Sequence, residues 1–368
     1  MSDLKTIELK QIAYQELLIE VQEVYEVLHR LKNSDAKITA YISTSLIPYL
    51  CFLCDGLDYF HKGTNKVHSN WYNDIKGNSV QKLVKENRSA LKLYSDYKKN
   101  KVIPKLEDDT DLFNELLIGN YNLIQKAIIK SFGQHDLGIY SFRNIDYANT
   151  YQLFKNLNTL YFDNEIIDSV IKEFGRILAN YISKASIYPV SKSPHQIFSF
   201  TDNFTHQDVY FKDSKRFNAF NNKEDKYWQL FLYNYYCQNN FIRDILPVVL
   251  GVRRNFYYRM KFCSYLLSIK GLDLLLKKVP KITEEHPSII ELINARETIV
   301  PINSDLRNNL FHYGIANIPY ESFDENKNLL TQIVEYSVMR PFEEFDNLVD
   351  QELDKYQKLI SEILFRFS

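Results

Sequence analysis

Apolar residues recur every three to five positions over most of the chain, which is the spacing of one face of an α-helix. Residues 7–32 show the pattern clearly and predict one amphipathic helix, with apolar positions at Ile12, Leu17, Val21, Val24, Leu28 and Leu31. Residues 38–60 are apolar on most sides, so they predict a buried, central helix. Further helical periods cover 79–100, 110–132 and 146–185, with a turn at 133–138. The first half of the chain is therefore expected to be helical.

The helical period breaks between residues 186 and 222. Pro189 and Pro194 fall here, and the runs 196–200 and 208–211 alternate apolar and polar residues as short strands do. We expect a small β-hairpin at this point, at the junction between two domains. A chain of 368 residues suits two domains, since single cores usually stop growing near ~250–300 residues.

Helical spacing returns after residue 222 and continues to the end of the chain. The predicted helices cover 226–250, 256–276, 289–313 with a break at Pro301, and 329–367 with an interruption near Pro341. Antiparallel helices of this size form a bundle. The expected fold class is all-α, with a helical domain at 1–185, a junction at 186–222 and a helical bundle at 223–368.

The charge balance limits the classes of partner. Lys and Arg number 45 against 46 Asp and Glu, for a formal net charge of −1. Bulk attraction to nucleic acid or to a membrane is therefore not expected, and any site for a polyanion must be a local patch. The 27 Tyr and 24 Phe residues could stack on bases, but most are expected in the core.

The ends and the cysteines bear on location. The N-terminal Met-Ser-Asp-Leu-Lys has no apolar run like that of a secretory signal, and the apolar stretch at 42–57 is too short and polar to span a bilayer. Four scattered cysteines do not form a disulfide framework. We expect a cytoplasmic protein with no membrane partner.

One segment suggests chemistry, Asp305 to Gly314, which reads Asp-Leu-Arg-Asn-Asn-Leu-Phe-His-Tyr-Gly. Arg307 carries a permanently charged planar group suited to a phosphate, and His312 carries an imidazole that exchanges a proton near neutral pH. Leu306, Leu310 and Tyr313 recur at helical spacing, so we expect the polar residues between them to lie on a helix whose other face is packed and which ends near Gly314. This combination suits a phosphodiester site.

A structural interpretation of the same residues stays open. Arg307 could pair with Asp305, with Glu297 or with a carboxylate on another helix. His312 could be a hydrogen-bonded residue near a helix end, where the helix dipole favours a positive charge. In that case neither residue would take part in chemistry.

The pattern Arg307-Asn308-x-x-x-His312, late in a predicted bundle of about 140 residues, resembles the signature of the HEPN superfamily. In that family an Arg, usually followed by a polar residue, precedes a His by a short spacer. The resemblance covers residues 223–368 and leaves the first half unexplained. Many larger HEPN nucleases carry a sheet-rich sensor domain, whereas residues 1–185 look helical.

The resemblance implies metal-independent RNA cleavage without a cofactor. The 2′-hydroxyl of RNA attacks the adjacent phosphorus and leaves a 2′,3′-cyclic phosphate. His312 is the expected general acid or base, Arg307 holds the phosphate oxygens, and Asn308 orients His312 or donates to the phosphate.

The family also implies a homodimer in which two motifs face each other. The spacing agrees, because five residues turn His312 about 140° from Arg307 and carry it ~7.5 Å along a straight helix. The expected setting is a toxin or phage-defence effector, silenced by a separately encoded antitoxin or regulator. The alternative is a non-catalytic helical module that binds RNA, a nucleotide or a protein.

A second basic segment, Arg253 to Lys261, interleaves positive charges with aromatic rings. Arg253, Arg254, Tyr257 and Arg259 are candidates for RNA contacts, through the backbone and a stacked base. The more ordinary interpretation is a solvated helix face whose Phe256 and neighbours lie in the core. No glycine-rich phosphate loop is present, and no metal or cofactor is expected.

Overall fold

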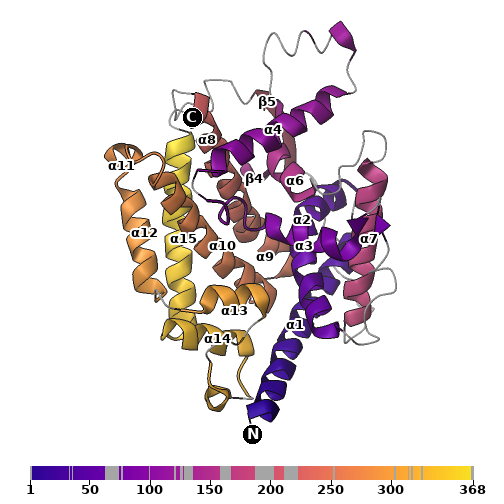
Figure 1. Ribbon diagram of the computed structural model, residues 1–368, viewed down its shortest axis with the longest axis vertical. Helices are drawn as coiled ribbons and strands as arrows, with labels where there is room; N and C mark the ends of the chain where they lie inside the picture. Colours follow the sequence, from indigo (N-terminus) through magenta and orange to yellow (C-terminus); the bar gives the residue numbers. More distant parts are fainter. Residues whose placement is uncertain are drawn as a thin grey trace.

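The computed structural model confirms a predominantly helical fold (Figure 1). It describes residues 2–32, 34, 36–62, 74–75, 78–98, 100–119, 122–124, 127, 136–157, 167–186, 203–210, 223–251, 253–301, 304–313, 315, 318–324 and 326–365. The long helix α1 runs from the N-terminus at one end of the molecule, and α15 lies along the opposite flank (Figure 1).

The helices of the first half agree with the predicted periods in part: the first two are slightly longer than predicted, and the later ones are shorter or interrupted. They are α1 (Ser2–Lys32), α2 (Ala36–His61), α3 (Val80–Ala90), α4 (Val102–Gly119), α6 (Thr150–Leu157) and α7 (Ile167–Ala185). The predicted central helix is α2, which is continuous and packs against α1, α3 and α7. Its residues Cys51, Phe52, Leu53, Cys54 and Leu57 are almost fully buried. Two short strands, β1 (Asp74–Ile75) and β2 (Asn78–Ser79), precede α3.

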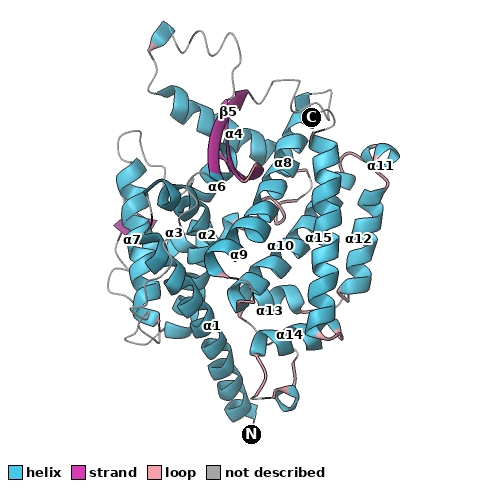
Figure 2. Cartoon of the chain, turned by 180° about the vertical axis from the view of Figure 1, so that it is seen from behind, coloured by secondary structure: helices cyan, strands magenta, loops and turns pink. Residues whose placement is uncertain are grey.

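A three-stranded antiparallel sheet, in the order β4-β3-β5, lies among the helices (Figure 2). Its strands are β3 (Asp136–Phe142), β4 (Ile145–Asn149) and β5 (Phe204–Tyr210). The prediction of a turn at 133–138 and a helix from 146 was wrong here. Arg143 and Asn144 both have positive φ and form the two-residue turn that joins β3 to β4, a conformation that suits hairpins and that Asn tolerates.

One strand of the predicted hairpin is confirmed, and its pairing with the other strand stays a prediction. Residues 208–210 belong to β5, but β5 pairs with β3 from the first half of the chain. The other expected strand, 196–200, lies outside the described residues. The junction segment therefore contributes a strand to a sheet begun more than sixty residues earlier.

The second half follows its predicted breaks closely. Its helices are α8 (Lys223–Asn240), a π-helical turn (Phe241–Ile245), α9 (Leu246–Leu250), α10 (Asn255–Leu276), α11 (Ile282–Glu285), α12 (Ser288–Ile299), α13 (Leu306–His312), α14 (Leu329–Val338) and α15 (Phe342–Leu364), with a short 3₁₀ turn at Tyr320–Ser322. Pro301 separates α12 from α13, and Pro341 precedes α15, because proline lacks the amide proton that a helix interior needs.

One hydrophobic core runs through both halves of the chain, from Leu17 to Leu364. Helix α1 packs against α9, α10 and α14, and strand β4 packs against α8. The predicted bodies at 1–185 and 223–368 thus share buried contacts, and their boundaries as domains stay a prediction.

Helices α1 and α10 meet through buried charges. The guanidinium of Arg259 is fully buried, with its Nε 2.6 Å from Oε1 of Glu20 and its Nη2 3.6 Å from Oε1 of Glu16. The hydroxyl of Tyr313 donates to the other oxygen of Glu20 at 2.6 Å. The carboxylate of Glu23 accepts the backbone N–H groups of residues 255 and 256 at the start of α10. We call Glu16, Glu20, Glu23 and Arg259 the buried charge cluster.

Glu16→Gln is expected to make the fold less sensitive to alkaline pH. Burial and then the charge of Glu20 raise the pKa of Glu16 to about 8, from an ordinary value of 4.5. The folded state therefore binds more protons than the unfolded state between those values, and the free energy of unfolding falls as pH rises through them. Glutamine mimics the protonated acid. Urea unfolding should show parent and variant alike at pH 5 and the variant more stable at pH 9. A constant difference across this range would contradict the assignment.

Candidate functional site

Helix α13 carries the predicted motif and is a single short helix. Its first residue, Leu306, donates its backbone N–H to Oγ of Ser304 at 3.1 Å. Tyr313 has a left-handed backbone with φ 49°, so the helix ends at His312. Gly314, which was expected to end the helix, lies outside the described residues.

The buried face of α13 fixes the direction of the motif. Leu306, Asn309 and Leu310 are almost fully buried, and Tyr313 packs against Gly56 of α2. A Cβ atom at Gly56 would lie 3.2 Å from the Tyr313 ring, so glycine permits this close approach. The remaining positions, Arg307, Asn308 and His312, face outward.

Arg307 is at the surface and pairs with a residue from the first half of the chain. Its side chain is 39% exposed, and its Nη2 lies 3.2 Å from Oδ1 of Asp96, in the turns that follow α3. The guanidinium also stacks over the ring of Phe311. Its Nε is buried without a hydrogen-bond acceptor, so the charged group is only partly satisfied.

His312 is exposed and contacts Arg88 of α3. Nη2 of Arg88 donates to Nδ1 of His312 at 3.2 Å and to the carbonyl oxygen of Phe311 at 2.5 Å. Nη1 of Arg88 pairs with Asp55 of α2 at 2.5 Å. Because a guanidinium only donates, Nδ1 of His312 accepts and the ring proton of the neutral form lies on Nε2.

The surroundings keep the imidazole neutral. Burial lowers the pKa of His312 below its usual value, and the positive charges of Arg88 and Lys92 lower it further. A neutral imidazole near pH 7 has the protonation state of a general base.

Asp96 gathers three cations around it. Lys92 lies 2.7 Å away, Arg307 3.2 Å and Lys270 of α10 3.6 Å. Burial opposes the ionisation of Asp96, but these positive charges outweigh it, and the pKa of Asp96 lies below its usual value. We call Arg88, Lys92, Lys270, Arg307 and His312 the basic site. Among the described residues, its two arginines and two lysines pair with the carboxylates of Asp55 and Asp96.

A cavity of about 360 Å³ opens beside Asp96. Its wall carries Lys92, Lys105 and Lys155, the carboxylates of Glu86 and Asp96, and the partly exposed ring of Tyr97. Lys155 lies over the ring of Tyr94 and, together with Lys105, pairs with Asp109. The cavity therefore extends the basic site with cations and an aromatic ring.

The contacts of Asn308 and Arg307 can be compared with the predicted roles of the motif and with its structural interpretation. Asn308 is exposed and its amide contacts Asp305 at 3.5 Å, not His312. Arg307 pairs with a carboxylate on a different element, Asp96, as the structural interpretation allowed. Both motif side chains nevertheless reach the surface, so they remain accessible to a ligand.

The second basic segment forms the start of α10 and is not part of the basic site. Arg259 is fully buried in the charge cluster, so its prediction as an RNA contact was wrong: Glu16 and Glu20 occupy its guanidinium. Phe256 is in the core, as the ordinary interpretation predicted.

The other candidates of this segment lie at the start of α10. Arg254 pairs with Glu26 of α1, and Tyr257 is half-buried. Arg253 is exposed, with a left-handed backbone at φ 66°. Sixteen residues of α10 separate Arg254 from Lys270, a distance of ~24 Å along the axis. RNA contacts at Arg253, Arg254 and Tyr257 stay a prediction that the position of the basic site does not favour.

Sequence reasoning missed Arg88, Lys92, Asp96 and Lys270. Arg88 and Lys92 are four residues apart, a spacing that places two cations on one side of a helical segment. Nothing in the local sequence indicates that this pair lies against a helix more than two hundred residues later. Only the tertiary contact of α13 with the end of α3 reveals it.

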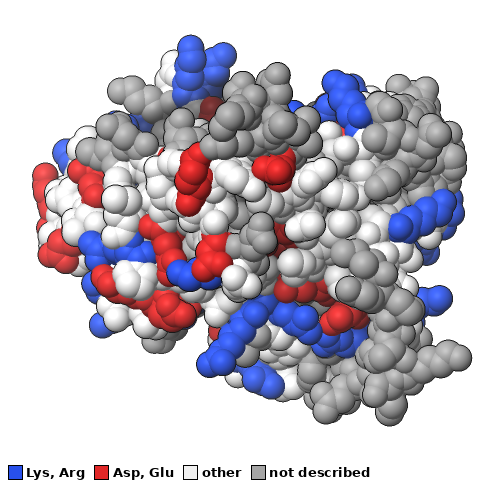
Figure 3. Space-filling view, turned by 90° about the horizontal axis from the view of Figure 1, so that it is seen from below, with Lys and Arg blue, Asp and Glu red and all other residues white. Residues whose placement is uncertain are grey.

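Figure 3 shows the charged side chains on the face seen from below. Lys and Arg form a strip there with Asp and Glu directly beside it, and other Lys and Arg residues lie apart from acidic ones (Figure 3). Among the described residues, no group of three or more His, Cys, Asp and Glu side chains is placed to hold a metal ion. No helix in the described ranges is long and apolar enough to cross a bilayer.

Comparison with protein-family models, with curated proteins and with solved structures finds no match.

Proposed function

We propose that this chain is a metal-independent endoribonuclease of HEPN type, with the basic site as its active site. The observation that carries the proposal is the meeting of Arg307 and His312 with Arg88 and Lys92 at the surface, where cations outnumber carboxylates. A phosphodiester is the ligand that such a group of planar and point cations favours.

The unfilled hydrogen-bonding capacity of the site supports an anionic ligand. Arg307 reaches Asp96 with Nη2, and its side chain is 39% exposed. Lys92 and Lys270 share the same aspartate. An RNA phosphate would compete with Asp96 for these donors and supply additional oxygens.

The reaction proceeds by attack of the 2′-hydroxyl oxygen on the adjacent phosphorus. The O2′–P bond forms, the P–O5′ bond breaks, and the product ends are a 2′,3′-cyclic phosphate and a 5′-hydroxyl. His312 takes the 2′-hydroxyl proton as general base. The imidazolium formed in this way returns the proton to the leaving 5′-oxygen. Arg307 neutralises the phosphate oxygens as charge builds on them.

Arg88 is the positioning residue for His312. In the resting geometry Nδ1 of His312 accepts from Arg88, so its lone pair is occupied. A phosphate that draws Arg88 toward its own oxygens frees Nδ1 for the 2′-hydroxyl. Substrate binding thereby switches the imidazole from an acceptor of Arg88 to a base.

The partners follow from the same proposal. A homodimer would place a second His312 opposite the first, so that two copies of the motif face one substrate. A toxin or phage-defence setting, with a separately encoded antitoxin or regulator, would restrain the cleavage. Sedimentation of the purified chain should give the mass of two copies.

The substrate class is tested with one oligonucleotide sequence in three chemistries. In excess EDTA the chain should cleave the RNA form and leave the DNA and 2′-O-methyl RNA forms intact, because both lack the nucleophile. Cleavage of all three forms, or loss of RNA cleavage in the chelator, would contradict the mechanism.

A second candidate function is RNA binding without cleavage. The contact of Arg88 with Nδ1 of His312 favours it, since a permanently occupied Nδ1 cannot act as a base. Tight binding of RNA by the parent protein, with no cleavage under any of the conditions above, would support this function instead.

Asp96→Asn is expected to tighten RNA binding, measured in a His312→Ala background that prevents cleavage. The change removes the carboxylate that occupies Lys92, Lys270 and Arg307. Each cation released to a phosphate should steepen the salt dependence of binding by about 0.7 in the log–log slope. Fluorescence anisotropy at several salt concentrations measures both effects. Asp354→Asn, at an ion pair on α15, is the matched control and should leave both unchanged. Equal affinities for the Asp96 and Asp354 variants would refute the contact with RNA.

A further inference from the structure

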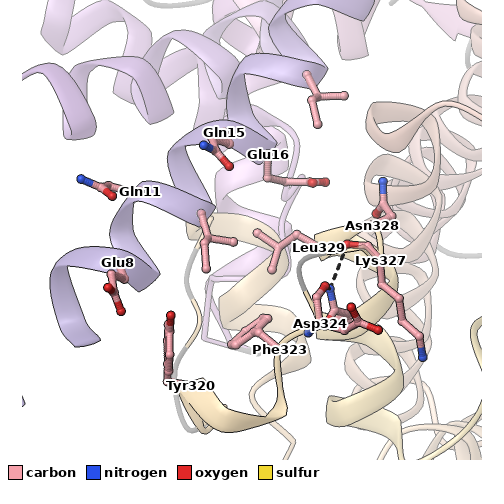
Figure 4. Close-up of a pocket in the computed structure, with 13 residues that line it drawn as sticks. Glu8, Gln11, Gln15, Glu16, Tyr320, Phe323, Asp324, Lys327, Asn328 and Leu329 are labelled. Carbon is pink, nitrogen blue, oxygen red and sulfur yellow. Dashed lines mark hydrogen bonds between the residues drawn. The ribbon is translucent and has the colours of Figure 1, made fainter. Parts of the chain in front are cut away.

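A second cavity, of about 510 Å³, lies between α1 and the segment that leads into α14. It is separate from the basic site and shares no lining residue with the cavity beside Asp96. Its volume falls within the range of sites for small organic ligands, roughly 300–1,000 Å³. Glu8, Gln11, Gln15 and Glu16 line one side, and the other side is lined by Tyr320, Phe323, Asp324, Lys327 and Asn328 (Figure 4).

We propose that this cavity binds a small organic cation of the alkylamine class, such as a di- or polyamine. Three carboxyl groups line it, from Glu8, Glu16 and Asp324, against the single ammonium of Lys327. The sign of the wall disfavours phosphates and other anions. Carboxylates and amide oxygens are the natural acceptors for the N–H groups of an ammonium.

The apolar part of the wall suits a methylene chain. Ile12, Ile19 and Leu329 line the cavity between the polar groups. Tyr320 and Phe323 add two aromatic rings, whose faces attract cations. An alkylamine carries both features that this wall matches, a positive end and an apolar chain.

Glu16 distinguishes the cavity from a shallow acidic groove. Glu16 is only 2% exposed, and its side chain extends from α1 into the space that faces Asn328 (Figure 4). Asn255 donates to its Oε1 at 3.2 Å, which holds the carboxyl in place. Asn328 in turn donates to the amide oxygen of Asn255 at 3.0 Å. The deep end of the cavity is therefore built from a positioned carboxyl group.

Binding should depend on pH through Glu16. The groups that face it are Glu20 and Glu23 on α1, Arg259 on α10 and Tyr313 after α13. Burial keeps this carboxyl protonated at pH 6, and its pKa is about 8. An alkylamine stays charged up to about pH 10. The amine should therefore bind more tightly at pH 9, where Glu16 is ionised, than at pH 6.

Isothermal titration of the full chain with spermidine tests the site. At pH 9, where Glu16 is ionised, we expect saturable binding with one site per chain, weakened about tenfold or more in Glu16→Gln and in Asp324→Asn, because each change removes a charged acceptor. Glutamine and asparagine keep the shape of the parent side chains, so the fold should be retained. Glu284→Gln, on the exposed turn α11 outside the cavity, is the matched control and should bind as the parent does.

The outcomes separate this site from the basic site. Absence of saturable binding, or equal binding by the Glu16, Asp324 and Glu284 variants, would overturn the proposal. Tighter binding at pH 6 than at pH 9 would overturn it as well. Because the readout is binding of an amine, the result does not depend on RNA cleavage.

Discussion

Replacing His312 with alanine is expected to slow RNA cleavage by about 10²- to 10⁴-fold, which is the usual contribution of a positioned acid or base. Arg307→Ala should cause a loss of similar size, since removing one group that stabilises the charge of a transition state costs about 10²- to 10³-fold. Both side chains are at the surface, so neither change should alter the fold. Cleavage of a fluorogenic RNA under single-turnover conditions measures the loss.

Two surface changes away from the basic site serve as controls for these variants. His286→Ala, at the end of α11, and Arg176→Ala, on α7, should cleave RNA at the parent rate. If His312→Ala cleaves as fast as His286→Ala, the imidazole of His312 has no role in the reaction. Thermal unfolding of all four variants distinguishes a chemical defect from a folding defect.

Glu20→Ala is expected to destabilise the fold by about 3–5 kcal/mol, the usual cost of removing one partner of a buried ion pair. The change leaves the buried guanidinium of Arg259 with the longer contact to Glu16 as its ion pair and a hydrogen bond to the carbonyl oxygen of Leu310, and it removes the acceptor of the Tyr313 hydroxyl. Because Tyr313 ends α13, the loss should also loosen the helix that carries the basic site. Urea unfolding at pH 7 measures the change.

Glu20→Gln is the graded variant for this prediction, since it keeps an acceptor of the same shape but removes the charge. Its loss of stability should lie between those of the parent and Glu20→Ala. Arg176→Ala breaks an exposed pair with Glu173 and should cause no measurable change. A loss below about 1 kcal/mol for Glu20→Ala would show that the buried charge cluster does not hold α1, α10 and α13 together.

Hydrophobic periodicity was enough to predict most of the helices. The central helix α2 follows from its apolar content, and the breaks at Pro301 and Pro341 follow from the missing amide proton of proline. Because both features are local, the sequence predicts them directly. The sheet was harder. Strand β3 pairs with β5, some seventy residues later, and the pairing depends on a contact that no local pattern encodes.

In the candidate site too, some residues could be predicted from the local sequence and others only from long-range contacts. The sequence of α13 contains Arg307 and His312, and the apolar positions between them correctly predict that both face outward. Arg88 and Asp96 could not be predicted, because they reach the motif only through the packing of α3 against the end of α13. The prediction of Arg259 as an RNA contact was wrong because the local sequence does not indicate whether an arginine on a helix is exposed to water or paired with a buried carboxylate, here that of Glu20.

The central claim is that the basic site cleaves RNA through its own 2′-hydroxyl. Mass spectrometry of the products made by the parent protein in excess EDTA tests it most directly. A 2′,3′-cyclic phosphate on one fragment and a 5′-hydroxyl on the other are predicted, with neither product formed by His312→Ala. A 3′-hydroxyl paired with a 5′-phosphate, or intact RNA after prolonged incubation with the parent, would contradict the claim.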